Sequence, residues 1–163
     1  MTTPDHHVSI RFGRLSDVST SQLLTHMNDP CIAAHLPLLT QPWTDEDAEA
    51  FLAAKQKRWR EDGLGHWAIH GSDRYVGWGG FEKEGEVWDF GLVLTPDAFG
   101  LGRRVFVKAL DFARQDERIK VISFLLAPSR TSLSALTRYG AVFVGEDAHA
   151  GQRFLRYELD LRP

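Results

Sequence analysis

The sequence predicts an α+β domain in which a mixed, mostly antiparallel sheet of about seven strands is flanked by about four helices. Three observations support this fold class. Alternating segments joined by short turns between residues 66 and 94 predict an antiparallel meander. A continuous apolar run at residues 121–126 predicts a strand that is covered on both faces. Segments with helical periodicity precede the meander and alternate with strands after it.

The length of 163 residues, with 43% hydrophobic and 25% charged residues, predicts one globular domain spanning residues 1–163. A net charge of −3 gives no general attraction to nucleic acid or to an anionic membrane, so neither is expected as a partner. The single cysteine, Cys31, excludes an internal disulfide, and the sequence shows neither a signal peptide pattern nor a membrane-length apolar run. These features predict a cytoplasmic protein.

The N-terminal part predicts one strand followed by helices. A strand is expected from Val8 to Leu15, and Asp17 is the predicted N-cap of a helix that ends near Met27. A short helical segment is expected over residues 31–36. Thr44, followed by acidic residues that favour a helix N-terminus, predicts a long helix that ends at Gly63.

The remainder predicts six strands and two helices. The expected strands cover residues 66–70, 75–81, 88–94, 121–126, 142–144 and 154–161, and the expected helices cover residues 103–115 and 128–140.

The transition from the strand at residues 88–94 to the next helix carries a candidate anion site. Gly100 and Gly102 lie at the predicted start of that helix, where a backbone without Cβ atoms can approach a ligand closely. Unpaired N–H groups and the helix dipole favour phosphate there, and Arg103 and Arg104 add positive charge. The alternative is a turn with two glycines and two solvated arginines, and this stretch alone does not decide between them.

The whole chain resembles the GNAT superfamily of acyl-CoA-dependent N-acetyltransferases, and within it the RimJ/RimL-like branch that acetylates protein N-termini. The resemblance rests on Asn28-Asp29-Pro30 before a Thr-x-x-Asp helix, on Trp67-Ala68-Ile69, and on Val76-Gly77-Trp78-Gly79-Gly80-Phe81. It also rests on the Asp89–Pro96 strand and on Ser129-x-x-Ser132 with Gly140 eight residues later.

Several positions depart from the family pattern. The pyrophosphate loop matches best as Asp97–Gly102, which puts an acid where the family has Arg or Gln. In the other register Phe99 takes the first place, and Gly102 and Arg104 take the two glycine positions. Leu136 stands where many relatives carry a tyrosine that protonates the departing thiolate. Ser129 replaces the usual Asn, and Ala141 replaces the usual Phe.

The resemblance implies acetyl-CoA as co-substrate and a set of residues that would bind it. A backbone N–H near Leu92, Val93 or Leu94 would polarise the thioester carbonyl. The implied cofactor-binding residues are Leu92, Val93, Leu94, Phe99, Gly100, Leu101, Gly102, Arg103, Arg104, Ser129 and Ser132. No His, Cys and Asp spacing indicates a metal site.

The acceptor amine must lose a proton at neutral pH, and Asp89 stands where the family often has a glutamate base. Asp89 is equally compatible with a solvated strand carboxylate. His66 and His70 are further candidates, although such histidines are usually structural. With Leu136 in place of tyrosine, Ser132 or water remains to stabilise the thiolate. The nearby acids Glu82, Glu84 and Glu86 indicate a solvated turn or a surface that attracts a cationic acceptor.

These observations predict an acetyl-CoA-dependent N-acetyltransferase that transfers acetyl directly to a primary amine, either a peptide N-terminus or a small molecule. Two alternatives on the same fold are a non-catalytic acyl-CoA-binding module and a protein-interaction domain. The acceptor pocket is expected from the variable loops at residues 37–43 and 147–153. Family members often dimerise, so a homodimer is a further expectation.

Overall fold

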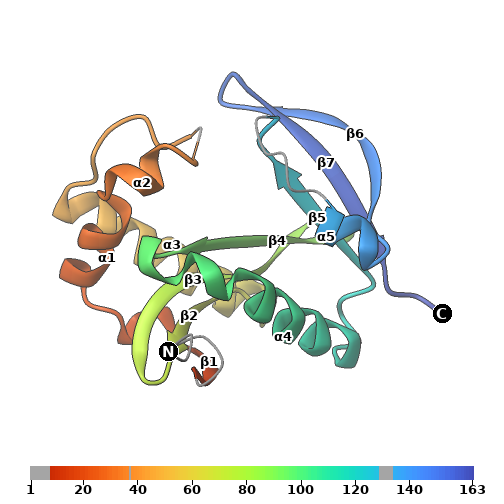
Figure 1. Ribbon diagram of the computed structural model, residues 1–163, viewed down its shortest axis with the longest axis horizontal. Coiled ribbons are helices and arrows are strands. Elements are labelled where there is room, and N and C mark those ends of the chain that lie inside the picture. The colour runs from red at the N-terminus through yellow and green to blue at the C-terminus, as the bar shows by residue number, and fades with distance from the viewer. Residues whose placement is uncertain (1–7, 37, 129–133) are drawn as a thin grey trace, which may run out of the picture.

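The computed structural model describes residues 8–36, 38–128 and 134–163, and within them seven strands form a single sheet (Figure 1). The strand order is β1-β2-β3-β4-β5-β7-β6, and β4 and β5 form the parallel pair in an otherwise antiparallel arrangement. The predicted α+β class is therefore confirmed. No helix in the described part of the chain combines the length and the apolar character needed to cross a membrane.

The elements are β1 (Ile10–Gly13), η2 (Leu15–Asp17), α1 (Thr20–Met27), α2 (Pro30–Ala33), α3 (Asp45–Asp62), β2 (His66–Gly71), β3 (Arg74–Glu84), β4 (Val87–Leu94), η3 (Pro96–Leu101), α4 (Gly102–Gln115), β5 (Val121–Leu126), α5 (Ser134–Arg138), β6 (Val142–His149) and β7 (Gln152–Asp160).

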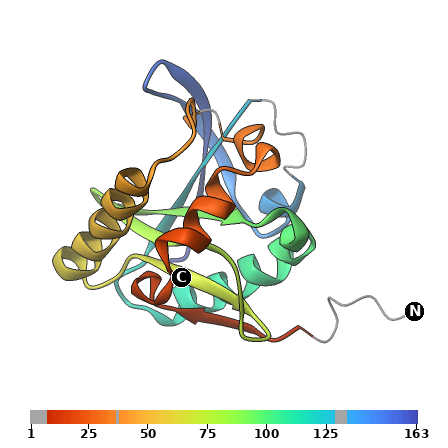
Figure 2. The same cartoon turned by 90° about the vertical axis from the view of Figure 1, so that its left-hand side faces the viewer.

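The two faces of the sheet carry different helices, with α4 on one face and α1 to α3 on the other (Figures 1 and 2). The alternation of side chains along β4 shows which of its residues face α4 and which face α1 to α3. Trp88 and Phe90 belong to the core cluster beneath α4, whereas Val93 packs with the cluster formed by α1, α2 and α3. Asp89 has the same parity as Val93, so its side chain lies on the α3 face of the sheet.

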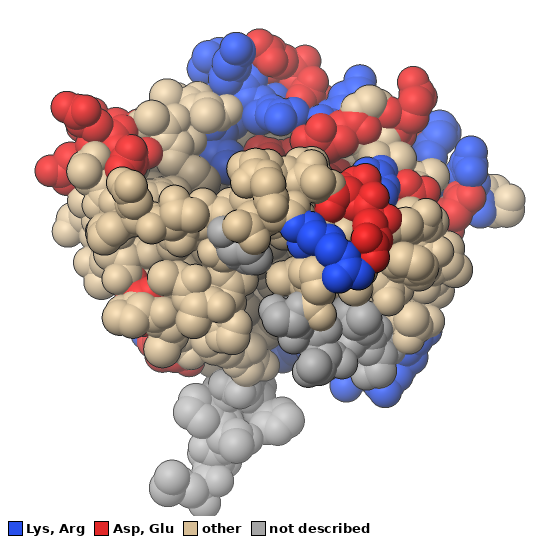
Figure 3. Space-filling model, turned by 90° about the horizontal axis from the view of Figure 1, so that it is seen from above, with Lys and Arg blue, Asp and Glu red and all other residues tan. Residues whose placement is uncertain are grey.

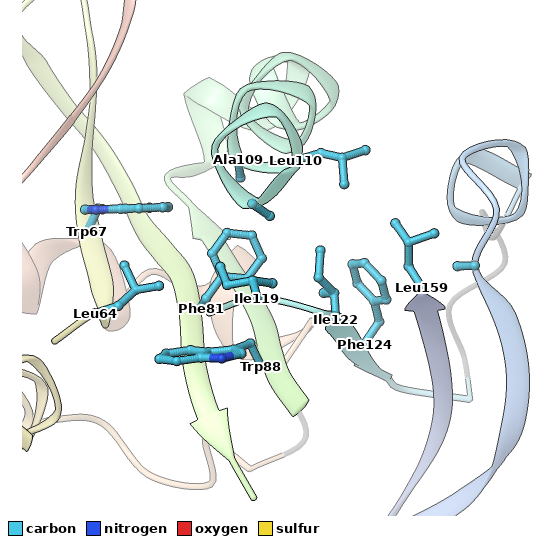
Figure 4. Packing of buried hydrophobic residues seen from close by; sticks show 12 residues of the cluster. Leu64, Trp67, Phe81, Trp88, Ala109, Leu110, Ile119, Ile122, Phe124 and Leu159 are labelled. Atoms are coloured by element: carbon cyan, nitrogen blue, oxygen red, sulfur yellow. The ribbon is translucent and has the colours of Figure 1, made fainter. Parts of the chain in front are cut away.

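The core beneath α4 fixes the position of that helix over the central strands. Figure 4 shows Ala109 and Leu110 above Phe81, Ile122 and Phe124. All five side chains are at most 3% exposed, and burial of this kind stabilises a fold by about 25 cal/mol per Å² of apolar surface. Because Ile122 and Phe124 come from β5 and Trp88 of the same core comes from β4, this core anchors both strands of the parallel pair.

The helix boundaries confirm some predicted caps and correct one. Thr44 and Asp47 form a capping box at the start of α3, and Gly63 ends that helix in the left-handed conformation with φ of 74°. The prediction that Asp17 caps α1 was wrong, because residues 15–17 form a 3₁₀ turn and Ser19 is the N-cap.

The C-terminal region differs from the prediction in one strand. The strand expected at residues 142–144 extends to His149, because its second half pairs with β7 although most of its side chains are polar or exposed. The predicted acceptor loop at residues 147–153 is therefore mostly β6–β7 hairpin. The helix predicted from residue 128 is described as α5 from Ser134, and the expected start at residues 129–133 lies outside the described residues.

The close approach of β3 and β4 depends on glycine. A Cβ atom at Gly79 would lie 2.4 Å from the carbonyl oxygen of Gly91, and one at Gly77 would lie 2.4 Å from that of Val93. Real Cβ atoms do not approach backbone oxygen so closely, so the strands would have to separate. These glycines thus hold β4 at its position beside the candidate site.

We predict that Gly79→Ala lowers the free energy of unfolding by about 1–3 kcal/mol, because the added methyl group meets rigid backbone. Urea denaturation measures the change. Gly102→Ala is the matched control, since its Cβ would lie 3.7 Å from Leu94, an ordinary contact in a helix. Equal stabilities of the two variants would contradict this account of β3 and β4.

Candidate active site

The central strands β4 and β5 are joined over a short distance and then diverge (Figure 1). Although both strands lie within the described part of the chain, their pairing consists of Trp88 with Ile122 and Asp89 with Ser123. Residues 90–94 of β4 and 124–126 of β5 continue past this point without pairing to each other. We call the space between these two segments the β4–β5 gap.

The hydrogen-bond pattern of β4 determines which backbone groups face this gap. The Thr95 N–H donates to the carbonyl of Val76 at 2.8 Å, and the β3–β4 register continues without a shift from Leu94 to Val87. Because partners alternate along an antiparallel ladder, the N–H of Val93 is directed toward β3. The N–H groups of Leu92 and Leu94 are directed toward the gap.

Asp89 and Ser123 connect the two strands where they begin to diverge. The Ser123 hydroxyl donates a hydrogen bond to Oδ1 of Asp89 at 2.9 Å, and Ser123 is almost completely buried. Burial raises the pKa of Asp89 to about 6 and the charges of Glu84 and Glu82 add to the rise, whereas Ser123 and Arg156 oppose it. A carboxylate with this pKa can accept and release a proton near neutral pH.

A cluster of charged side chains surrounds Asp89 on the α3 face. Lys55 of α3 forms an ion pair with Glu82 of β3, with Nζ 2.9 Å from Oε2. His66 lies with Nε2 3.9 Å from Oε1 of the same glutamate. Burial lowers the pKa of His66 well below its ordinary value, and the charges of Lys55 and Arg58 add to this effect. The imidazole is therefore neutral at physiological pH.

The candidate anion site between β4 and α4 is a short helical segment. Residues 96–101 form the 3₁₀ helix η3, which leads directly into α4 at Gly102. The N–H of Ala98 donates to Thr95, and that of Gly102 donates to Phe99, so η3 uses part of the expected N–H donors internally. Phe99 and Gly100 are exposed on η3, whereas Leu101 is buried in the core.

Positive side chains of α4 line a groove on the protein surface. The groove has a volume of about 360 Å³ and is lined by Arg103, Arg104, Val107, Lys108, Asp111 and Tyr139. Arg104 also donates a hydrogen bond to the carbonyl of Val8. We call it the α4 groove. Its three cationic side chains outnumber its one carboxylate, which makes the groove suitable for a phosphorylated ligand.

Asp97, the acid found in place of the family's Arg or Gln, is compensated by its neighbours. It accepts hydrogen bonds from the hydroxyl of Thr95 and the guanidinium of Arg74. The Thr95 bond and then the Arg74 bond hold the pKa of Asp97 below its usual range. Because Arg74 neutralises the carboxylate, Asp97 presents less repulsion to a phosphate than the sequence alone indicates.

Two of the predicted site residues, Ser129 and Ser132, lie outside the described residues. Leu136 is half-buried on α5 and packs against the α4 core, as an apolar side chain would be expected to do. Sequence analysis missed Ser123, Lys55 and Arg74 because their partners are distant in sequence. Among the described residues, no group of three His, Cys, Asp or Glu side chains is arranged to hold a metal ion.

A second hollow lies next to α3. It has a volume of about 500 Å³ and is lined by residues 38–43 together with Asp47, Ala50 and Phe51. The described part of the loop predicted at residues 37–43 thus borders a hollow, as an acceptor pocket requires. Seen from above, uncharged side chains cover most of the lower left of the view, and charges of both signs gather along its upper edge and on the right (Figure 3).

The family comparison assigns this fold, with its seven-stranded mixed sheet, to the GNAT acetyltransferases. The chain belongs to this family, because the family model described as an acetyltransferase (GNAT) domain matches residues 10–142. Members of the family use acetyl-CoA as the acyl donor. A search of curated proteins found no match.

Several solved structures share the fold. An acetyltransferase from Agrobacterium tumefaciens str. C58 is 14% identical, with a TM-score of 0.72 over 98% of this chain and 95% of that chain. A GNAT family acetyltransferase from Bacillus anthracis is 18% identical, with a TM-score of 0.69 over 94% of this chain and 95% of that chain. The aminoglycoside acetyltransferase AAC(6')-Ib, solved with coenzyme A, is 12% identical, with a TM-score of 0.70 over 94% of each chain. Identities this low establish the fold alone.

We predict that Asp89→Asn stabilises the protein at alkaline pH. The pKa of Asp89 is about 6 in the folded protein, above the ordinary value of 3.8, so the stability contributed by the bound proton is lost as pH rises through 6. The free energy of unfolding of the variant should exceed that of the native protein by on the order of 2 kcal/mol at pH 8 and by much less at pH 4. Urea denaturation at several pH values measures this difference, and a difference that does not change with pH would contradict it.

Proposed function

We propose that this protein is an acetyl-CoA-dependent N-acetyltransferase that transfers acetyl directly to a primary amine, with Asp89 as the general base. The observation that carries the proposal is the Asp89–Ser123 hydrogen bond at the point where β4 and β5 diverge. It puts a carboxylate of pKa about 6 next to a gap into which backbone N–H groups are directed. The cytoplasm is the proposed location.

The residues present suit a CoA thioester. The β4–β5 gap offers the N–H groups of Leu92 and Leu94 to an extended chain with amide groups, and the α4 groove offers Arg103, Arg104 and Lys108 to phosphates. Acetyl-CoA supplies the activated acetyl group when bound. Since η3 uses N–H donors internally, the arginine side chains provide a larger share of phosphate binding than the sequence pattern indicates.

The backbone of β4 supplies electrostatic stabilisation. When an amine attacks a thioester carbonyl, negative charge develops on the carbonyl oxygen. The N–H groups of Leu92 and Leu94 are held in place by the β3–β4 register and need no rearrangement to donate to that oxygen. Val93, the third residue predicted for this role, directs its N–H toward β3, so the proposal keeps Leu92 and Leu94.

Asp89 removes the proton from the attacking amine, either directly or through water. A primary ammonium group has a pKa near 10, so at neutral pH it must lose a proton before it can attack. The carboxylate of Asp89 is ionised above pH 6 and accepts this proton. Ser132, predicted to stabilise the departing thiolate, stays a prediction because it lies outside the described residues.

The acceptor is proposed to be a peptide N-terminus or a small-molecule amine, in keeping with the resemblance to the RimJ/RimL-like branch. The hollow beside residues 38–43 gives space for the body of such an acceptor on the α3 face. AAC(6')-Ib has been solved with ribostamycin and coenzyme A, which supports small-molecule amines as acceptors on this fold. The expected homodimer is also a proposal, supported by exposed Val142, Phe143 and Val144 on edge strand β6.

We predict that Asp89→Asn lowers kcat/KM for a primary amine by about 10²–10⁴-fold, because the general base is removed. In the native protein, kcat/KM should fall below pH 6 as Asp89 is protonated. A steady-state assay of CoA release across pH measures both effects. Glu86→Gln, in the exposed turn before β4, is the control and should keep native kinetics. Native rates in Asp89→Asn would overturn the assignment of the base.

We predict that the protein binds acetyl-CoA and desulfo-CoA. Arg103→Ala should lower the affinity for each ligand by about tenfold or more, because one charge-assisted contact to phosphate is lost. Gly100→Glu should abolish binding, since it introduces an acid on the exposed side of η3. Calorimetric titration measures the affinities, with ATP as a comparison ligand. Arg60→Ala, which removes an exposed arginine in the last turn of α3, is the control. Binding without turnover across an amine panel would favour the non-catalytic module, and no binding at all would favour the interaction domain.

A further inference from the structure

Lys55 of α3 is a lysine enclosed in the protein on the α3 face of the sheet. Its side chain is 13% exposed, and Nζ lies 5.1 Å from the ring centre of Phe51 and 5.2 Å from that of Trp78. Burial lowers the pKa of Lys55, and its ion pair with Glu82 opposes this fall. A methionine or leucine would pack against these rings without the cost of burying a charge, so packing alone does not explain why a lysine occupies this position.

Glu82, the partner of Lys55, lies directly opposite Asp89. The two residues pair in the antiparallel register of β3 and β4, so their side chains project from the same face of the sheet. Side chains of such pairs are separated by about 5 Å at Cβ. The negative charge of Glu82 makes Asp89 harder to ionise.

The other charged groups around Asp89 come from four elements. Glu84 lies on the same strand as Glu82, Lys55 and Arg58 come from α3, and neutral His66 comes from β2. From β7, Arg156 lowers the pKa of Asp89, but it is itself paired with Asp147 at 3.2 Å and with Glu158 at 3.1 Å. Arg58 pairs with Glu84 at 3.6 Å, and Lys55 is the cation whose ion pair offsets Glu82, the carboxylate opposite Asp89 in the strand register.

We propose that Lys55 is a positioning residue that neutralises Glu82 and thereby keeps Asp89 in its base form at neutral pH. The proposal rests on the function proposed above for its effect on catalysis, but the ionisation of Asp89 is measurable without turnover. Lys55 acts through Glu82, with which it forms its ion pair. Its loss would leave the charge of Glu82 uncompensated, so Asp89 would bind its proton at higher pH.

The first experiment follows the carboxyl carbon of Asp89 by NMR in ¹³C-aspartate-labelled protein, with the resonance assigned by its loss in Asp89→Asn. The titration midpoint should rise by at least about 0.5 pH unit in Lys55→Met, because the charge of Glu82 opposite Asp89 is then uncompensated. It should fall in Glu82→Gln. In the Lys55→Met, Glu82→Gln double variant the pair again has no net charge, so the midpoint should return close to the native value.

Two further variants separate this electrostatic effect from a structural one. Lys55→Arg retains the positive charge and should keep the native titration midpoint of Asp89. Lys57→Met removes an exposed lysine of the same helix and should also leave that midpoint unchanged. If Lys55 only supports packing, Lys55→Met would lower stability and leave the midpoint of Asp89 unchanged. That result would overturn the proposal.

The pH profile of kcat/KM then tests the consequence for catalysis. The acidic limb should move to higher pH in Lys55→Met and to lower pH in Glu82→Gln, in the same order as the NMR midpoints. If the midpoints move as expected and the protein shows no acetyl transfer, the proposed function fails and the electrostatic role of Lys55 stands. If transfer occurs and neither midpoint nor limb moves, the role of Lys55 fails and the proposed function stands.

Discussion

The short contact between β4 and β5 is the constraint on which the rest of the site depends. Two residue pairs hold the strands together, and beyond them each strand is fixed by other neighbours. Glycines in β3 hold β4 close on one side, while β5 pairs with β7 over its full length. Trp88, Ile122 and Phe124 pack in one core beneath α4, so neither strand can move to close the gap without disturbing that core. The unpaired N–H groups of β4 are therefore available to a ligand.

The same constraint explains why a carboxylate is buried at the start of the gap. Asp89 lies at the last paired position, where Ser123 from β5 donates to it and nearby side chains exclude much of the solvent. This burial raises the pKa of Asp89 and makes ionisation unfavourable for the fold. Stability and proton transfer thus make opposite demands on one residue, which is common at catalytic sites.

Other acids near the site are compensated individually. Glu82 is paired with Lys55, and Asp97 is paired with Arg74 from the β2–β3 hairpin. The sequence shows only an excess of acids around residues 82–97, which suggests either a solvated turn or a weakened phosphate site. In the folded protein these pairs leave Asp89 as the carboxylate whose burial and hydrogen bond suit it for proton transfer.

Much of the fold followed from local patterns, because those patterns also determine local structure. The alternation from Trp88 to Leu94 gave the strand and its two faces, and the capping box at Thr44 gave the start of α3. The contacts that define the site were not predictable in this way. Lys55 and Glu82 are 27 positions apart, and Ser123 and Asp89 are 34 positions apart. Such pairs depend on sheet register and helix packing, which a single sequence does not reveal.

The local structure around the glycines was also hidden from the sequence. Gly100 and Gly102 are compatible with an open loop and with a 3₁₀ turn, and the choice depends on packing of Ala98 and Leu101 against the β2–β3 face. The full length of β6 was missed for a similar reason. Pairing with β7 extends a strand whose own residues from Gly145 to His149 lack a strong apolar alternation.

The most direct test of the central claim is an NMR titration of ¹⁵N-labelled protein with acetyl-CoA, because alternation along β4 distinguishes adjacent amides. The account predicts large downfield shifts of the amide protons of Leu92 and Leu94, which face the β4–β5 gap, and a much smaller change at Val93. Equal shifts at all three residues, or no change at Leu92 and Leu94 when acetyl-CoA is bound, would contradict the claim that β4 presents these groups to the thioester.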